Sequence, residues 1–165
     1  MKTQVKNYFE DDSYYVELYF PRLNKTYVGK CKLHDEDKET ALRFKGYEIA
    51  ENRAWIKYFK EQKKEIKLKK KTLEDFIGSF GSNCNYDATN YIARKLRKQI
   101  YLYSKEISEI ETAINELEED ILFMIHPAKT LEKLSKSIAT FGVSSTSMSE
   151  ALKNLNEALG QSQLK

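Results

Sequence analysis

Residues 96–124 read LRKQIYLYSKEISEIETAINELEEDILFM, and their apolar side chains recur at alternating intervals of four and three residues. This spacing keeps every apolar residue on one side of an α-helix, as in a coiled coil. It predicts one long helix with a stripe for oligomerisation or helix packing, formed by Leu96, Ile100, Tyr103, Ile107, Ile110, Ile114, Leu117, Ile121 and Met124. The stripe can pack on another helix of the chain or on a second copy, and we favour a homo-oligomer.

The preceding region predicts a second long helix, which runs from His34 and the acids at 35–37 to about Ser79, because strong helix formers continue there without proline. We expect its first half to pack on the strands upstream and its second half to project. Gly46 costs about 1 kcal/mol relative to alanine inside a helix, so close packing or a kink is expected at that position.

The first third of the chain predicts strands. Apolar and polar side chains alternate over residues 14–20 and again over 27–33, and Pro21 to Asn24 between them favour a turn. Residues 5–9 can add a strand through a turn at 10–12. The fold class is therefore α+β: an N-terminal antiparallel β-hairpin or small sheet packed on a helix, followed by long coiled-coil-like helices.

Three regions follow from these patterns. Residues 1–60 form a head with the sheet and the start of the first long helix, 61–125 form a helical hairpin or coiled coil, and 128–160 form short C-terminal helices. Pro127 separates the last two regions because proline ends or kinks a helix. No apolar run is long enough for a membrane span, and the start lacks a secretion signal, so no membrane partner is expected.

Charge is distributed unevenly, although the net charge is only +3. A candidate basic patch for binding comprises Lys63, Lys64, Lys67, Lys69, Lys70, Lys71, Arg94, Lys95, Arg97 and Lys98. A turn near residue 83 would place Lys69 to Lys71 opposite Arg97 and Lys98, and the acids of 106–120 beside Arg53, Lys57 and Lys60. Neighbouring aromatic side chains make nucleic-acid binding an alternative, because bases stack on aromatic rings.

No pattern of catalytic residues is present, so we expect no enzyme, metal or cofactor. Zinc sites use four cysteine or histidine ligands, usually in two close pairs. Only Cys31 and His34 form such a pair, whereas Cys84 and His126 are isolated. Two cysteines in a chain rich in lysine and glutamate indicate a reducing compartment without disulfides.

The segment GKCKLHDED at 29–37, followed by Gly46-x-x-x-Ala50-x-x-Arg53-Ala54, resembles small uncharacterised proteins encoded by bacteriophages of Gram-positive bacteria. Asp35 stands where that group usually has proline, and Gly46 lies about two residues late. The resemblance covers about residues 25–55. It implies a phage accessory protein acting in the cytoplasm of the bacterial host, and it transfers no functional residues.

From these observations we expect a non-enzymatic accessory protein that binds a host or phage protein complex, which can itself contain nucleic acid. Anti-CRISPR-like inhibition of a host defence nuclease is the specific form we favour. The alternatives are a nucleic-acid-binding accessory protein with a basic helical tip and a structural coiled-coil component of the virion.

Overall fold

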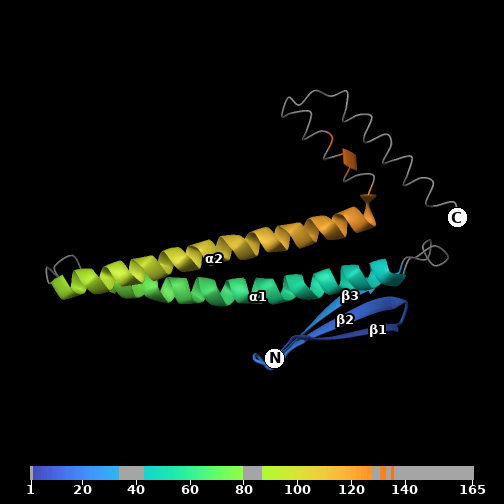
Figure 1. The fold of residues 1–165 in the computed structure, drawn as a ribbon, viewed down its shortest axis with the longest axis horizontal. Coiled ribbons are helices and arrows are strands. Elements are labelled where there is room, and N and C mark those ends of the chain that lie inside the picture. Colours follow the sequence, from blue (N-terminus) through green and yellow to red (C-terminus); the bar gives the residue numbers. More distant parts are fainter. Residues whose placement is uncertain (1, 34–42, 80–86, 128–130, 133–134, 136–165) are drawn as a thin grey trace. The chain divides into compact units, whose positions relative to one another are not determined.

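The computed structural model describes residues 2–33, 43–79, 87–127, 131–132 and 135. Three strands precede two long helices: β1 (Gln4–Glu10), β2 (Ser13–Phe20), β3 (Lys25–Lys32), α1 (Arg43–Ser79) and α2 (Asp87–Ile125) (Figure 1). The predicted α+β class is confirmed. The helix start expected at 34–37, the turn near residue 83 and most of the short helices expected at 128–160 lie outside the described residues.

The chain divides into two compact units, Met1–Ile121 and Leu122–Lys165. The first unit contains the sheet, α1 and most of α2. The expected boundary between 60 and 61 falls inside α1, which runs through it as one helix. Over the residues described, neither helix is long and apolar enough to cross a membrane.

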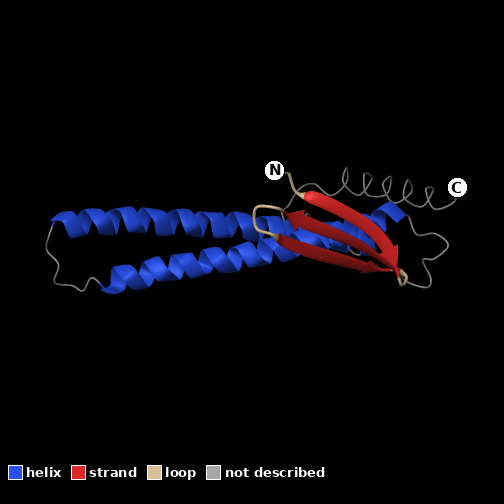
Figure 2. Ribbon diagram, turned by 90° about the horizontal axis from the view of Figure 1, so that it is seen from below, coloured by secondary structure: helices blue, strands red, loops and turns tan. Residues whose placement is uncertain are grey.

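The strands form an antiparallel meander in the order β1-β2-β3 (Figure 2). A two-residue turn joins β1 to β2, and its residues Asp11 and Asp12 have φ of 48° and 52°. Two consecutive positive φ values match the type I′ turn, whose twist suits a hairpin. The next connection ends at Asn24, whose φ of 48° lies in the left-handed region that asparagine tolerates, and the turn expected there is confirmed.

The first half of α1 covers β2 and β3 through very small residues. A Cβ added to Gly29 of β3 would lie 1.7 Å from the Ala50 carbonyl oxygen of α1. A Cβ on Gly46 would lie 2.2 Å from the Tyr14 ring, so the close packing expected at Gly46 is confirmed. Strand and helix can approach this closely only because these side chains are missing.

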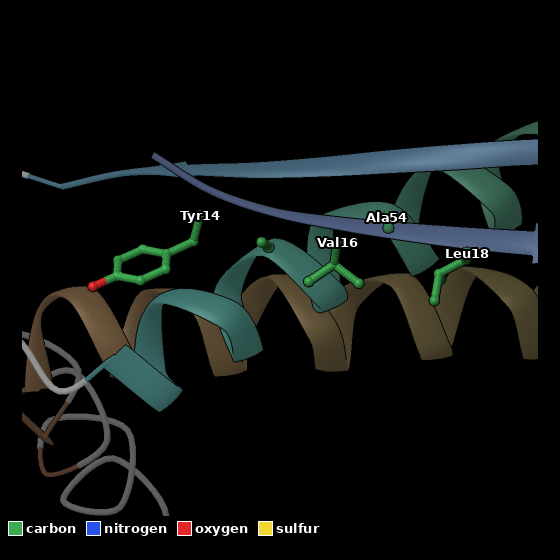
Figure 3. Close-up of a cluster of buried hydrophobic side chains, with 5 residues drawn as sticks. Tyr14, Val16, Leu18 and Ala54 are labelled. Atoms are coloured by element: carbon green, nitrogen blue, oxygen red, sulfur yellow. The ribbon is translucent and has the colours of Figure 1, made fainter. Parts of the chain in front are cut away.

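The core lies between β2 and α1. Tyr14, Val16 and Leu18 point from alternate positions of β2 towards the helix, where Ala50 and Ala54 are fully buried (Figure 3). Alternation on a strand places these three side chains on one face, as the sequence predicts. Three isoleucines of α1, Ile49, Ile56 and Ile66, are buried but lie outside this cluster.

Helix α2 lies alongside α1, and ion pairs join the two. Lys60 Nζ lies 2.9 Å from Glu118 Oε1, and the Nζ atoms of Lys63 and Lys67 lie 3.6 and 3.5 Å from Glu111 Oε1. The expected position of the acids of 106–120 beside Lys60 is confirmed, but Lys67 meets Glu111 and not the vicinity of Lys98, so the expected register is shifted. Helical side chains lean towards their own N-terminus, so a residue of α1 meets a residue of α2 further from the turn.

The apolar stripe of α2 is turned away from solvent. Ile107, Ile114 and Ile121 are buried, Ile114 with only 4% of its surface exposed. The other members are partly buried: Leu96, Ile100, Tyr103, Ile110, Leu117 and Met124. The stripe therefore serves helix packing within the chain.

Candidate functional site

The two edges of the sheet differ in how their backbone groups are covered. At the β3 edge, Arg53 Nη1 donates to the Lys30 carbonyl oxygen at 2.6 Å, and Lys57 Nζ donates to the Val28 carbonyl oxygen at 2.6 Å. Both side chains come from α1, one turn apart. The side chains of Arg53 and Lys57 therefore close this edge to a further strand, and the acids of 106–120 do not hold them as expected.

The β1 edge is open in the part of the chain that the structure describes. β1 pairs only with β2, and none of the hydrogen bonds found among the described residues comes from a side chain to its free backbone edge. The strand has seven residues and contains no proline. An exposed row of unpaired N–H and C=O groups can accept another strand.

Two apolar side chains of β1 accompany this open edge. Val5 and Phe9 are 52% and 49% exposed. They lie on the sheet face that packs on α1, because Val5 is paired with Leu18 and Phe9 with Tyr14. Helix α1 packs on β2 and β3 and makes little or no contact with β1, so the apolar face of the sheet continues past the helix.

The opposite face of the sheet is aromatic and charged. The rings of Tyr8 and Tyr15 stack with centroids 5.0 Å apart, with Lys6 over Tyr8 and Lys30 over Tyr15. The Tyr8 hydroxyl donates to Glu17 Oε1 at 3.1 Å. Partial burial and the neighbouring Glu17 carboxylate raise the pKa of Tyr8.

The predicted basic patch is partly used inside the molecule. Lys63 and Lys67 pair with Glu111, and Lys70 lies 3.7 Å from Glu74 of the same helix. Lys95 lies over the Tyr91 ring. The other six cations have no ion pair among the described residues: Lys64, Lys69, Lys71, Arg94, Arg97 and Lys98.

The aromatic residues near the patch divide into two groups. Tyr91 and Tyr101 are exposed on α2, the latter by 67%. Trp55, Tyr58 and Phe59 belong to α1 and pack in a ring cluster with Phe20, whose ring stacks on that of Tyr58 at 4.3 Å. Of these five rings, those of Tyr91 and Tyr101 are therefore accessible to a base, and Lys95 already lies over the Tyr91 ring.

A shallow cleft of about 320 Å³ lies between the two helices. Phe59 and Ile66 of α1 and Ile110 and Ala113 of α2 supply apolar walls, and Glu106 and Glu109 add carboxylates. Both glutamates are exposed on α2, so their carboxylates are in contact with solvent.

The possible zinc ligands are not brought together among the described residues. No group of three or more histidine, cysteine or acidic side chains gathers within them. Cys31 is a partly buried free thiol, and burial raises its pKa despite the nearby Arg53, which makes it a poor nucleophile. His34 and Cys84 lie outside the described residues.

The best candidate for a functional site is thus the β1 edge with Val5, Asn7 and Phe9. The sequence predicts this strand but not its openness, because the hydrophobic pattern does not tell which strand forms an edge. No protein family model, curated protein or solved structure matches this chain.

Proposed function

We propose that this chain is a non-enzymatic accessory binding protein that engages a protein of a host or phage complex by strand addition to β1. The observation that carries the proposal is the difference between the two sheet edges. Arg53 and Lys57 cover the β3 edge, whereas the β1 edge is bare within the described residues. Partners that bind in this way contribute an extended segment, which gains affinity from main-chain hydrogen bonds.

The direction of the backbone groups in β1 follows from the closed edge. The Val28 and Lys30 carbonyl groups point away from β2, so Glu17 and Tyr15 opposite them direct their backbone groups towards β1. Their partners in β1 are Lys6 and Tyr8. The alternate residues Val5, Asn7 and Phe9 therefore direct their N–H and C=O groups outward.

Side chains at the same edge provide specificity. Val5 and Phe9 offer apolar contact on one face, while Lys6 and Glu10 carry opposite charges on the other. A partner strand that matches this edge alternates apolar residues with charged residues, because neighbouring strands pair side chains on each face. Side chains on both faces of the sheet then select the partner strand, and they fix its register against β1.

The resemblance of about residues 25–55 to phage proteins supports a host complex as the target of this binding. We propose inhibition of a defence nuclease of the CRISPR kind, achieved by occupying a protein site on the nuclease complex.

Nucleic-acid binding is the second candidate, favoured by the six cations without an ion pair in the described chain and by exposed Tyr91 and Tyr101. Oligonucleotide binding that weakens as salt rises would support that candidate. Recovery only in purified virions would support a structural role.

The Asn7→Pro variant tests strand addition. Proline removes the outward N–H of Asn7 and leaves the ladder with β2 intact, as edge strands allow. Loss of one hydrogen bond and the added ring should weaken binding about tenfold or more. The measurement is capture of a host complex from lysate, with mass spectrometry to identify the partner, and then its affinity for the purified variant.

Asn7→Ala is the matched control, because it keeps the N–H and removes only the side chain. It should retain the partner that the unaltered protein captures. Equal binding by Asn7→Pro, with an unchanged circular dichroism spectrum, would show that the partner does not use the β1 edge.

A further inference from the structure

The outward face of α2 carries a stripe of its own, opposite the buried one. Its residues are spaced three and four apart, so they share one side of the helix, and all of them are exposed: Lys95, Lys98, Leu102, Lys105, Glu109, Thr112, Glu116 and Glu119. We call these eight residues the outer stripe. Glu109 also borders the cleft between the two helices, whereas the other seven residues do not line it.

The outer stripe changes sign at its middle. Its first half contains only basic charges, and its second half contains only acidic charges. The order is symmetric about residue 107, so a second α2 laid antiparallel presents the opposite charge at each charged position. The facing pairs are Lys95 with Glu119, Lys98 with Glu116 and Lys105 with Glu109, and Leu102 faces Thr112.

We propose that two copies of this chain associate through the outer stripes of their α2 helices, antiparallel and around a two-fold axis near residue 107. A parallel, in-register pair would place like charges opposite each other, which is unfavourable. A nucleic acid laid along the whole stripe would meet three glutamates in its second half. Charge complementarity thus selects a second copy as the occupant.

The neighbouring residues agree with this register. Arg94 and Asp120 flank the outer stripe at its two ends and fall opposite each other in the same antiparallel arrangement. The Lys105 Nζ and Glu109 Oε1 atoms already lie 3.7 Å apart within one helix, with both side chains about two-thirds exposed. Such an exposed pair is held weakly, so it can exchange for the equivalent pair between copies.

The association is expected to be weak and sensitive to salt. The outer stripe extends over about 36 Å at 1.5 Å per residue. Each of its ion pairs occurs twice by symmetry, but exposed pairs contribute little individually and are screened by salt. Electrostatic matching of this type gives specificity of partner and register more than affinity.

Two charge-reversed variants test the arrangement. One carries Lys95→Glu and Lys98→Glu, and the other carries Glu116→Lys and Glu119→Lys. Each variant opposes like charges in its own dimer, whereas a mixture of the two restores opposite charges at all four positions. Lys69→Glu with Lys71→Glu is the matched control, because both lysines are exposed on α1 and lie outside the outer stripe.

Sedimentation equilibrium of the full chain provides the readout. We expect the unaltered protein and the control to dimerise at about 0.05 M salt and to dissociate towards about 0.5 M, where the screening length is short. Each reversed variant should associate at least tenfold more weakly, and the equimolar mixture should recover dimers. Circular dichroism confirms that every variant remains helical.

Three outcomes would overturn the proposal. They are a monomeric mass for the unaltered protein at low salt and high concentration, association of either reversed variant at the original strength, and failure of the mixture to associate. If the double variant Lys95→Glu, Lys98→Glu loses oligonucleotide binding and the equimolar mixture does not recover dimers, the outer stripe binds a polyanion instead of a second copy. The β1 edge has no part in these measurements, so they succeed or fail independently of strand addition.

Discussion

At the scale of single residues, the contact between sheet and helix depends on absent side chains. Gly29 and Gly46 lie where β3 and β2 meet α1, and Ala50 and Ala54 continue the same contact surface. Small residues let the backbones approach closely, which buries Val16 and Leu18 completely. Side-chain volume therefore limits the packing of the strands on α1, and this contact has no space for a larger side chain.

Gly29→Ala is expected to destabilise the fold. Its new Cβ would lie 1.7 Å from the Ala50 carbonyl oxygen, which is backbone and cannot rotate away. Overpacking of a core costs about 1–3 kcal/mol and occasionally more, and this position should lie at the upper end. The free energy of unfolding in urea measures the effect.

Gly78→Ala is the matched control for this substitution. Nothing lies within 4 Å of a Cβ added there, and alanine favours the helix over glycine. The control should be neutral or slightly more stable. If both variants have the stability of the unaltered protein, the close approach at Gly29 does not exist in solution.

At the scale of elements, α1 performs two packing tasks on different sides. Its small residues contact the sheet, and its larger apolar residues Ile66 and Phe59 meet α2 at the cleft. Helix α2 packs on one side only, through Ile107, Ile114 and Ile121. Its other side is charged and exposed among the described residues, and the outer stripe proposed to bind a second copy lies there.

Ile107→Asp combined with Ile114→Asp is expected to disrupt the packing of α2. Each change places a carboxylate at a buried position, with a cost of several kcal/mol against a total stability of about 5–15 kcal/mol. Thermal unfolding followed by circular dichroism should show a lower midpoint or no cooperative transition.

Ser108→Asp combined with Asn115→Asp is the control for the buried pair, since each residue follows one of the isoleucines and is exposed. Exposed substitutions usually change stability by about 0.5 kcal/mol or less. Equal melting of the two double variants would mean that the stripe of α2 is not packed.

At the scale of the whole first unit, ion pairs hold the sheet to α1 beside the apolar core. Lys25 of β3 pairs with Glu61 and lies 3.9 Å from Glu65. Lys25, and then Tyr27, hold the pKa of Glu61 below its ordinary value. Burial and the same carboxylate raise the pKa of Tyr27 to about 12, although its buried hydroxyl makes no hydrogen bond of good geometry among the described residues.

Stability should therefore fall in acid, with Glu61 contributing to the loss. A carboxyl group whose pKa is lowered in the folded state binds its proton more weakly than in the unfolded chain. Its contribution is present above the unfolded pKa of about 4.3 and is lost as pH falls through the folded value. Denaturant midpoints of Glu61→Gln and of the unaltered protein should differ at pH 7 and converge in strong acid.

Glu65→Gln provides the comparison, because its carboxylate is farther from Lys25. In the unaltered protein, the free energy of unfolding should be lower in acid than at pH 7. Glu65→Gln should reduce this pH dependence less than Glu61→Gln does. A Glu61→Gln variant that loses as much stability on acidification as the unaltered protein would show that the pair with Lys25 does not couple to folding.

Local pattern by itself determined the elements of this protein. Alternation over 14–20 identifies β2, the four-three spacing of residues 96–124 identifies α2, and Asn24 marks a turn, because each depends on neighbours along the chain. The need for close packing at Gly46 follows from the cost of glycine in a helix. These features are all confirmed in the structure.

Only the tertiary structure decided which groups meet across distance. The register of α1 against α2 depends on side-chain lean and on the interhelical contact, so Lys63 and Lys67 pair with Glu111 and leave the expected basic patch. Arg53 and Lys57 bind at β3, so β1 is the open edge within the described part of the chain, and this depends on where α1 crosses the sheet. Sequence periodicity specifies which face of an element is apolar, but the partner of that face is fixed by packing in three dimensions.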